Sequence, residues 1–243
     1  MHGIVSLLDS DHNQQVEELW VELERRFSVR GVYITPYPHF SYHVAQDYDV
    51  DKLEPILQHI TSNITTFKVR TSGLGVFTGN SPVLYIPVAR NLELTQLHQE
   101  LWEKLSTTSA GIVNYYHPEQ WMPHINIGFG DISKDILSQI VPFLAERDFS
   151  WEITINNIAL IYDTGAKQEL KARFDIINKA VPGESSMEGL HSHPLTHELL
   201  NQVYRVREQI MQGTNRKLFE DSTEIIRQQR EERTLQLTRE DEE

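Results

Sequence analysis

The sequence predicts an α+β fold with a mixed or antiparallel sheet and helices on its outside. Three observations favour this class. Hydrophobic residues make up 39% of the 243 residues, enough to form a full core. Short β-branched and aromatic runs are interrupted by four amphipathic helical stripes. Two of the runs flank a turn sequence that suits antiparallel strands, and strands next to hairpins favour a mixed or antiparallel sheet over a purely parallel one.

In the first half of the chain, strands and helices follow one another closely. Residues 3–9 predict a strand, and residues 13–27 predict a helix because their apolar residues recur at helical spacing. A strand is predicted within residues 32–45, including 39–45, followed by a helix over 49–63. Residues 66–77 and 82–89 are predicted to pair as a hairpin, since Thr78-Gly79-Asn80-Ser81 between them is typical of turns.

The second half continues this pattern and then changes in composition. Helices are predicted over 91–106 and 133–147, and strands over 124–129, 151–162 and 170–177. A linker that begins at Val181-Pro182-Gly183 is expected to separate a folded domain, 1–180, from a charged helical C-terminal extension, 181–243. An apolar stripe in this extension predicts that its helices pack on the domain, bind a protein partner or self-associate.

Composition excludes several kinds of chemistry. The absence of cysteine excludes disulfides, thiolate metal sites and a cysteine nucleophile. The net charge of −13 argues against a broad surface that tracks the phosphates of long nucleic acid, but it is compatible with a small or terminal phosphate ligand. The chain start lacks the features of a signal peptide and no apolar run has the length of a membrane span, so we expect a cytoplasmic protein without membrane association.

One short motif occurs twice. Pro38-His39-Phe40-Ser41-Tyr42 corresponds to Pro123-His124-Ile125-Asn126-Ile127, and each copy lies on a predicted strand. Because strand side chains alternate between faces, His39 and Ser41 share one face, as do His124 and Asn126. Each strand therefore offers an apolar face to a core and a polar face to a cleft.

Two facing histidines suit cleavage of a phosphodiester. A neutral imidazole can remove a proton from an attacking water or hydroxyl, while a protonated one donates to the leaving oxygen, and each transfer accelerates a reaction by roughly 10²–10⁴-fold. Donors aimed at the non-bridging oxygens stabilise the charge that develops on them. His39 and His124 are therefore the candidate catalytic residues, and Ser41 and Asn126 the candidate phosphate-binding residues.

These motifs resemble those of the two-histidine (2H) phosphoesterase superfamily, in particular its 2'-5' RNA ligase-like and cyclic phosphodiesterase branch. The family carries two His-x-Thr/Ser motifs on strands; His39-Phe40-Ser41 fits fully, whereas His124-Ile125-Asn126 departs at its third position. The order of elements matches over about residues 1–180. The resemblance implies a bilobal fold with two pseudo-twofold related lobes of mainly antiparallel sheet, with outer helices.

The resemblance also implies a reaction without metal or other cofactor. It implies hydrolysis or ligation at a 2',3'-cyclic or 2'-5' phosphodiester, with a small nucleotide or an RNA end as substrate. The assignment of acid and base to the two histidines stays open, because the pseudo-symmetry makes their positions equivalent. Asn126 predicts weakened or altered activity, since an amide is bulkier than a hydroxyl and holds its donor farther from the backbone.

Other residues near the motifs are further candidates for the cleft. His43 falls on the His39 face, where it would either line the cleft or, as the favoured alternative, pack inside the protein. Four aromatic residues flank the motifs and would stack on a base or pack in the core; these are Tyr37, Tyr116, Trp121 and Phe129. Arg90 ends the second hairpin strand, where it would contact a phosphate or lie in solvent.

Two alternatives to an enzyme remain open. The first is a catalytically weak or inactive module that binds a nucleotide or phosphate in the same cleft and a partner through its helical tail. The second is a scaffold with a vestigial cleft. His191, His193 and His197 in the tail resemble a metal-binding spacing, but Pro194 interrupts them and they are better explained as part of a linker, so no metal site is predicted.

Overall fold

The computed structural model describes residues 1–165 and 167–176, which form ten β-strands, four α-helices and two short 3₁₀ helices. The predicted C-terminal extension and its three histidines lie outside the described residues. The proposed domain boundary at residue 180 lies there too, so it stays a prediction.

The first sheet has five strands and is antiparallel throughout. The order across it is β10 (Gln168–Asp175), β9 (Asn157–Asp163), β1 (His2–Leu7), β2 (His39–Tyr48) and β6 (Ser109–Ile112). The first histidine motif therefore begins β2, directly beside β1. Apolar side chains of both strands, such as Ile4 and Phe40, are fully buried, and they hold this sheet to the core.

The second lobe is built from shorter antiparallel strands. β4 (Gly75–Phe77), β5 (Val83–Pro87) and β7 (His124–Gly128) form one ladder, and β3 (Phe67–Arg70) pairs with β8 (Glu152–Ile155). A bridge between Thr71 and Val88 connects the two groups, and the Ala89 N–H donates to the Arg70 carbonyl at 2.7 Å. The second histidine motif begins β7, so each lobe carries one motif. The predicted α+β class with mainly antiparallel sheets is confirmed.

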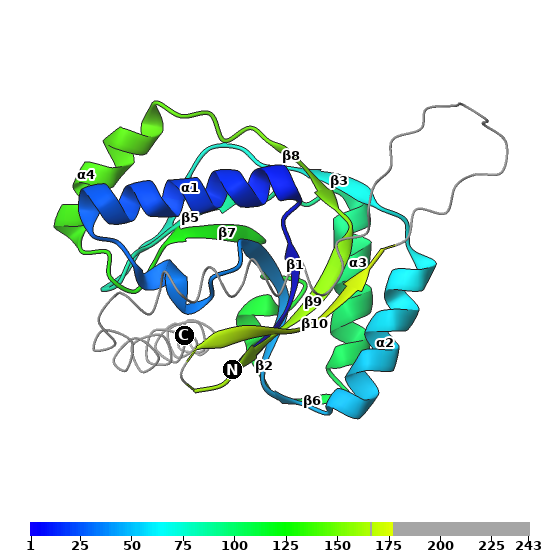
Figure 1. Ribbon diagram of the computed structural model, residues 1–243. Helices are drawn as coiled ribbons and strands as arrows, with labels where there is room; N and C mark the ends of the chain where they lie inside the picture. The colour runs from blue at the N-terminus through cyan, green and yellow to red at the C-terminus, as the bar shows by residue number, and fades with distance from the viewer. Residues whose placement is uncertain (166, 177–243) are drawn as a thin grey trace, which may run out of the picture.

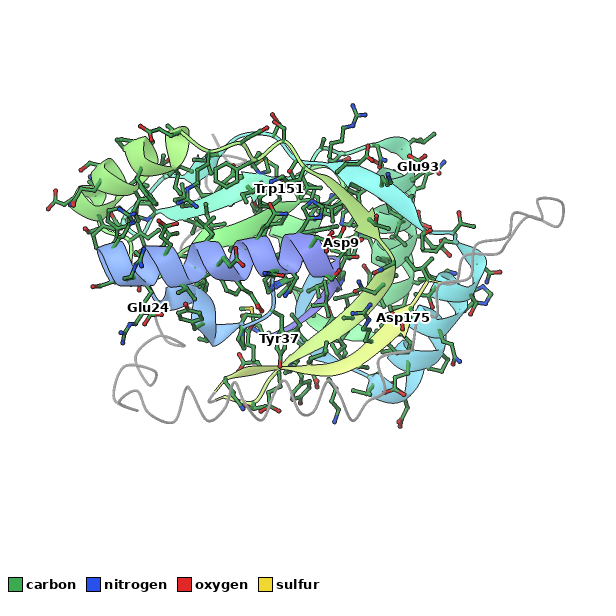
Figure 2. The ribbon with its side chains drawn as sticks, turned by 45° about the horizontal axis from the view of Figure 1, so that its top comes forward. Asp9, Glu24, Tyr37, Glu93, Trp151 and Asp175 are labelled. Carbon is green, nitrogen blue, oxygen red and sulfur yellow. The ribbon has the colours of Figure 1, made fainter. Side chains whose placement is uncertain are left out.

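Helices cover both lobes from the outside (Figure 1). α1 (Ser10–Phe27) lies beside β7 and packs with α4 (Lys134–Ala145), whereas α2 (Val50–Asn63) and α3 (Leu92–Leu105) lie against the five-stranded sheet. Asp9 caps α1, because one carboxylate oxygen accepts the His12 N–H at 3.1 Å. The other oxygen accepts the Thr154 N–H of β8 at 2.9 Å, which ties the helix start to the second lobe. Figure 2 labels Asp9 at the start of α1.

Two predicted strands are each divided in the structure. The prediction of one strand over 66–77 is wrong, because the chain bends at residues 72–74, with Gly73 at φ +65°, and this bend separates β3 from β4. The predicted hairpin is confirmed for β4 with β5, while β3 pairs with β8. The predicted strand over 151–162 likewise divides into β8 and β9, which join different sheets. The short strand β6 was not predicted.

An irregularity in β2 decides where His43 lies. Ser41 pairs with Val5 and His43 with Ile4, so Tyr42 is an extra residue in the ladder. This bulge interrupts the alternation of side chains, and Val44 rather than His43 reaches the cleft face. His43 is fully buried, and its Nδ1 lies 2.7 Å from the Tyr48 hydroxyl. The placement of His43 in the cleft is therefore wrong, and the packing alternative is correct.

A second histidine, His98 on α3, is also fully buried. Its Nε2 lies 3.0 Å from the Tyr42 carbonyl, which can only accept, so Nε2 carries the proton. Its ring stacks on Trp121 with centroids 3.7 Å apart. Burial lowers the pKa of both His43 and His98 to about 4. Both rings are therefore neutral parts of the core at neutral pH.

We expect these two histidines to make folding sensitive to acid. Their ordinary pKa is 6.5, so the unfolded chain binds these protons more readily than the folded chain. The free energy of unfolding should fall as the pH drops from 6.5 to about 4, by up to about 3 kcal/mol for each histidine. Urea unfolding across this range measures the slope, and His98→Gln, which retains a donor for the Tyr42 carbonyl, should reduce it. The matched control is His59→Gln at an exposed position on α2; an equal change in both variants would contradict the expectation.

The short helix η1 (Gly31–Ile34) packs closely on the turn that follows β7. One oxygen of Asp131 accepts the N–H groups of Arg30 at 2.5 Å and Gly31 at 3.0 Å. A Cβ on Gly31 would lie only 1.8 Å from the Phe129 carbonyl oxygen. Only glycine allows this close approach, which holds the entry to β2 against the end of β7.

Substitution of this glycine should loosen the connection between the two motif strands. Gly31→Ala is expected to lower the free energy of unfolding by about 1–3 kcal/mol, because backbone must move to admit the methyl group. Urea unfolding provides the measurement. Gly3→Ala is the control, since its Cβ would meet Val5 at 3.6 Å, an ordinary contact; equal losses in the two variants would show that the close approach is unimportant.

Candidate active site

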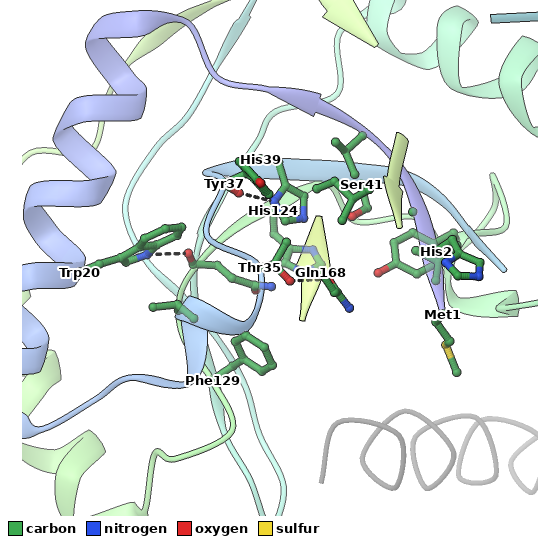
Figure 3. A pocket seen from close by; sticks show the side chains of 17 residues that line it. Met1, His2, Trp20, Thr35, Tyr37, His39, Ser41, His124, Phe129 and Gln168 are labelled. Atoms are coloured by element: carbon green, nitrogen blue, oxygen red, sulfur yellow. Dashed lines mark hydrogen bonds between the residues drawn. The ribbon is translucent and has the colours of Figure 1, made fainter. Parts of the chain in front are cut away.

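A single cleft brings the two motifs together. His39 and Ser41 enter it from β2, and His124 and Asn126 enter it from β7. Figure 3 shows His39, Ser41 and His124 close to one another in this cleft. All four side chains are partly exposed, whereas Phe40, Tyr42, Ile125 and Ile127, which alternate with them, are fully buried. The alternation predicted from the sequence therefore holds over both motifs.

Both histidines are oriented by the same hydrogen bond. The Nδ1 of His39 lies 2.5 Å from the Tyr37 carbonyl oxygen, and that of His124 lies 2.6 Å from the Met122 carbonyl oxygen. In each motif the acceptor belongs to the residue two positions before the histidine. A carbonyl oxygen can only accept, so Nδ1 carries the proton in both rings. Nε2 is then the nitrogen that can exchange a proton with a ligand when the ring is neutral.

Aromatic side chains surround His124. The ring of Phe77 lies 4.9 Å from it, Tyr85 lies at 5.2 Å and Tyr115 at 6.2 Å, measured between centroids. Tyr85 is the cross-strand partner of Asn126, and a Cβ on Gly75 would meet its ring at 2.2 Å. None of the three was predicted as a site residue, because their proximity to His124 depends on the pairing of β4, β5 and β7.

Of the predicted flanking residues, some line the cleft and others do not. Tyr37, Tyr116 and Phe129 line it. Trp121 is only 1% exposed and does not, since it packs on His98 within the core. Arg90 does not line the cleft either: its guanidinium lies 5.6 Å from the centre of the Trp121 ring and donates to the Trp121 carbonyl at 3.2 Å.

The cleft also contains residues that no sequence motif indicated. Trp20 of α1 and Val32 of η1 form part of its wall. The Thr35 hydroxyl donates to the Gln168 side chain, which connects the segment before β2 to β10 (Figure 3). These residues lie far apart in the sequence, and only the fold places them together.

The described residues that line the cleft include no lysine or arginine. The polar side chains that line it are imidazoles, hydroxyls and amides, so these side chains offer hydrogen bonds more than permanent positive charge. Within residues 1–165 and 167–176, no cluster of three or more His, Cys, Asp or Glu side chains is arranged to hold a metal ion. None of the helices in the described part of the chain is both long and apolar enough to cross a membrane.

Known proteins with similar sequences include two from Bacillus cereus, strains B4264 and ATCC 14579, both described as a putative phosphoesterase. Each is 27% identical to this chain over 118 residues, which is 49% of this chain and 64% of the relative. The matched region thus spans slightly less than two thirds of the relatives' own length.

Solved structures give weaker similarity. The crystal structure of TT0787 of Thermus thermophilus has a TM-score of 0.49 and 13% identity, covering 73% of this chain and 98% of that chain. E. coli LigT complexed with 3'-AMP has a TM-score of 0.47 and 11% identity, covering 72% of this chain and 96% of that chain.

A family model provides the broader match. The model of the 2'-5' RNA ligase superfamily matches residues 8–167, which include both histidine motifs and most of the described structure. This match confirms the resemblance that the two motifs carry. The chain belongs to the 2'-5' RNA ligase superfamily.

Proposed function

We propose that this protein is a metal-independent phosphodiesterase that acts on a 2',3'-cyclic or 2'-5' phosphodiester of a nucleotide or RNA end. The observation that carries the proposal is the matched pair of histidines. Each presents Nε2 as its exchangeable nitrogen and each is oriented through Nδ1 by a backbone carbonyl. Such a pair provides both proton transfers of the reaction.

For a 2',3'-cyclic phosphate, the reaction proceeds by attack of water on phosphorus. The neutral histidine accepts a proton at Nε2 from the water as the new P–O bond forms. The bond from phosphorus to one ribose oxygen breaks, and the protonated histidine gives its Nε2 proton to that oxygen. The product is a phosphomonoester beside a free hydroxyl. The imidazolium formed during attack keeps its Nδ1–H bond to the carbonyl, which stabilises it.

Ser41 and Asn126 are proposed to bind the two non-bridging oxygens. Both enter the cleft from the same strand faces as the histidines, two residues further along each motif. A hydroxyl and an amide can each donate one hydrogen bond to an anionic oxygen. A phosphodiester carries a single negative charge, and the protonated histidine of the pair provides one positive charge beside these neutral donors.

Asn126 also favours a second candidate function, a module that binds a nucleotide or phosphate without turning it over. The longer amide holds its donor farther from β7 than a serine or threonine hydroxyl would. A substrate would still bind there, with its phosphate displaced from the position that in-line attack needs. In that case the C-terminal residues would serve a protein partner.

Activity measurements on the histidine variants test the proposed reaction. With 2',3'-cyclic nucleotides and short 2'-5' linked oligonucleotides, turnover should persist in excess chelator. His39→Ala and His124→Ala should each lower kcat by about 10²–10⁴-fold, because each removes one proton transfer. His59→Ala, at an exposed position on α2, is the matched control. Loss of turnover on chelation, or retention of it in either cleft variant, would contradict the proposal. Nucleotide binding without turnover, lost in His39→Ala, would favour the binding module.

Substitutions at Asn126 test its contact with the phosphate. Asn126→Ala should lower kcat/KM by about 10–100-fold, the equivalent of a hydrogen bond to a charged group. Asn126→Thr, unlike Asn126→Ala, should have a kcat/KM equal to that of the wild type or above it, since threonine provides the hydroxyl of the family motif. Folding should tolerate the change, because among the described residues the buried Asn126 Oδ1 has no hydrogen-bond partner. An unchanged rate in Asn126→Ala would show that the amide does not contact the reacting group.

A further inference from the structure

At the two motifs, β2 and β7 are each paired with a strand on one side only. β2 pairs with β1 at Ser41, and its pairing with β6 begins only at Ala45. β7 pairs with β5 at Asn126 and is the last strand of its ladder. Backbone carbonyls on such an edge need donors from elsewhere when they are buried. A further strand would provide them, but it would occupy the edge beside the cleft.

Two tryptophan side chains provide these donors. The indole N–H of Trp121 donates to the Ser41 carbonyl at 2.8 Å, and that of Trp20 donates to the Asn126 carbonyl at 3.1 Å. Both tryptophans are almost fully buried, with exposures of 1% and 3%. The indole N–H is the only hydrogen-bonding group of the side chain, so each tryptophan is committed to that carbonyl.

The two carbonyls occupy equivalent positions. Each belongs to the third residue of its motif, the residue whose side chain is proposed to bind the phosphate. The carbonyl carbon is bonded to the Cα that carries this side chain, so a shift of the strand backbone at this residue would move both. An indole that holds the carbonyl therefore also holds the donor of that residue. The correspondence between Trp121 with Ser41 and Trp20 with Asn126 repeats the symmetry of the histidines.

Trp121 is itself held in place by its neighbours. Its ring stacks on His98 with an interplanar angle of 15°, and the Nε2–H of His98 donates to the Tyr42 carbonyl at 3.0 Å. Two successive carbonyls of β2 are thus bound by a stacked pair of rings at the bulge. Trp121 also lies two residues before Pro123, which leads into the second motif. Its hydrogen bond therefore connects the backbone entering β7 to β2, the strand of the opposite lobe.

Trp20 holds the second motif from α1. Its ring forms part of the cleft wall and meets Tyr33 of η1 edge to face, with centroids 6.1 Å apart. Because Asp9 ties the start of α1 to β8, Trp20 projects from a helix that is anchored to the same lobe as β7. The Asn126 carbonyl is thereby held by a rigid element.

We infer that Trp20 and Trp121 are positioning residues, each of which aligns one phosphate-binding side chain through the carbonyl of the same residue. The inference rests on the proposed function, since it concerns the donors of that reaction. It assigns Trp121 to Ser41 and Trp20 to Asn126. Substitution of Trp121 should therefore change kcat only when Ser41 is present, and substitution of Trp20 should change kcat only when Asn126 is present.

Double-mutant cycles test this assignment. Trp121→Phe keeps an aromatic ring but removes the donor, and it should lower kcat by about tenfold, the equivalent of one neutral hydrogen bond. In a Ser41→Ala background the same substitution should change kcat less than twofold, because the side chain that it aligns is absent. In an Asn126→Ala background the tenfold effect should remain. Trp20→Phe should show the opposite pattern, with its effect lost only in Asn126→Ala.

A purely structural role predicts a different outcome. If the tryptophans only stabilised the fold, each substitution would lower kcat equally in every background. Under the positioning role, the loss of thermal stability is the same in every background, but the loss of kcat depends on whether the partner side chain is present. Trp151→Phe, at a position outside the cleft lining, is the matched control and should leave kcat within twofold of wild type. Tenfold losses that persist in every background would overturn the positioning role.

The proposed function and the inference fail in distinguishable ways. If the wild type turns over no cyclic or 2'-5' phosphodiester, the proposed reaction fails, and the same cycles are measured on the calorimetric Kd for a nucleoside 2'-monophosphate. If the change in Kd on each tryptophan substitution depends on whether its partner side chain is present, the positioning role is supported without catalysis. If the change in Kd is the same in every background, the positioning role is overturned. Absence of both turnover and binding would overturn both.

Discussion

The hydrogen bond between each motif histidine and the carbonyl two residues before it is the interaction on which the rest of the site depends. Through Nδ1, the carbonyls of Tyr37 and Met122 select the tautomer and orient the rings of His39 and His124. Each acceptor lies just before a proline that leads into the strand, so the motif contains its own means of alignment. The remainder of the fold then needs only to bring the two strands together.

That requirement explains the division into two lobes. β2 belongs to the five-stranded sheet and β7 to the shorter ladder, and the two strands lie side by side without forming one sheet. If β2 and β7 belonged to one continuous sheet, strand backbone would occupy the space in which the polar side chains of the two motifs now meet. The open edges need other hydrogen-bond donors, and buried indoles provide them for Ser41 and Asn126. The cleft and the buried tryptophans are thus two consequences of one arrangement.

The polar character of the cleft fits this construction. Its described lining residues offer imidazole, hydroxyl and amide groups rather than lysine or arginine, so precise placement contributes more than net charge to recognition of a ligand. The buried histidines have a different role. His43 and His98 lie in the core, where burial lowers their pKa and keeps them neutral, and His98 supports Trp121 by stacking. These four histidines therefore divide between a structural role for His43 and His98 and the proposed chemistry for His39 and His124.

The sequence by itself determined the features that depend on local periodicity. The repeated Pro-His motifs, the shared faces of His39 with Ser41 and of His124 with Asn126, and the four helices follow from side-chain alternation and helical spacing. Only the tertiary structure decided what depends on contacts between distant segments. The pairing of β3 with β8, the bulge that turns His43 inward and the contact of Tyr85 with His124 belong to this group. No local pattern encodes them, because strand register and burial are set by which surfaces meet when the whole chain packs.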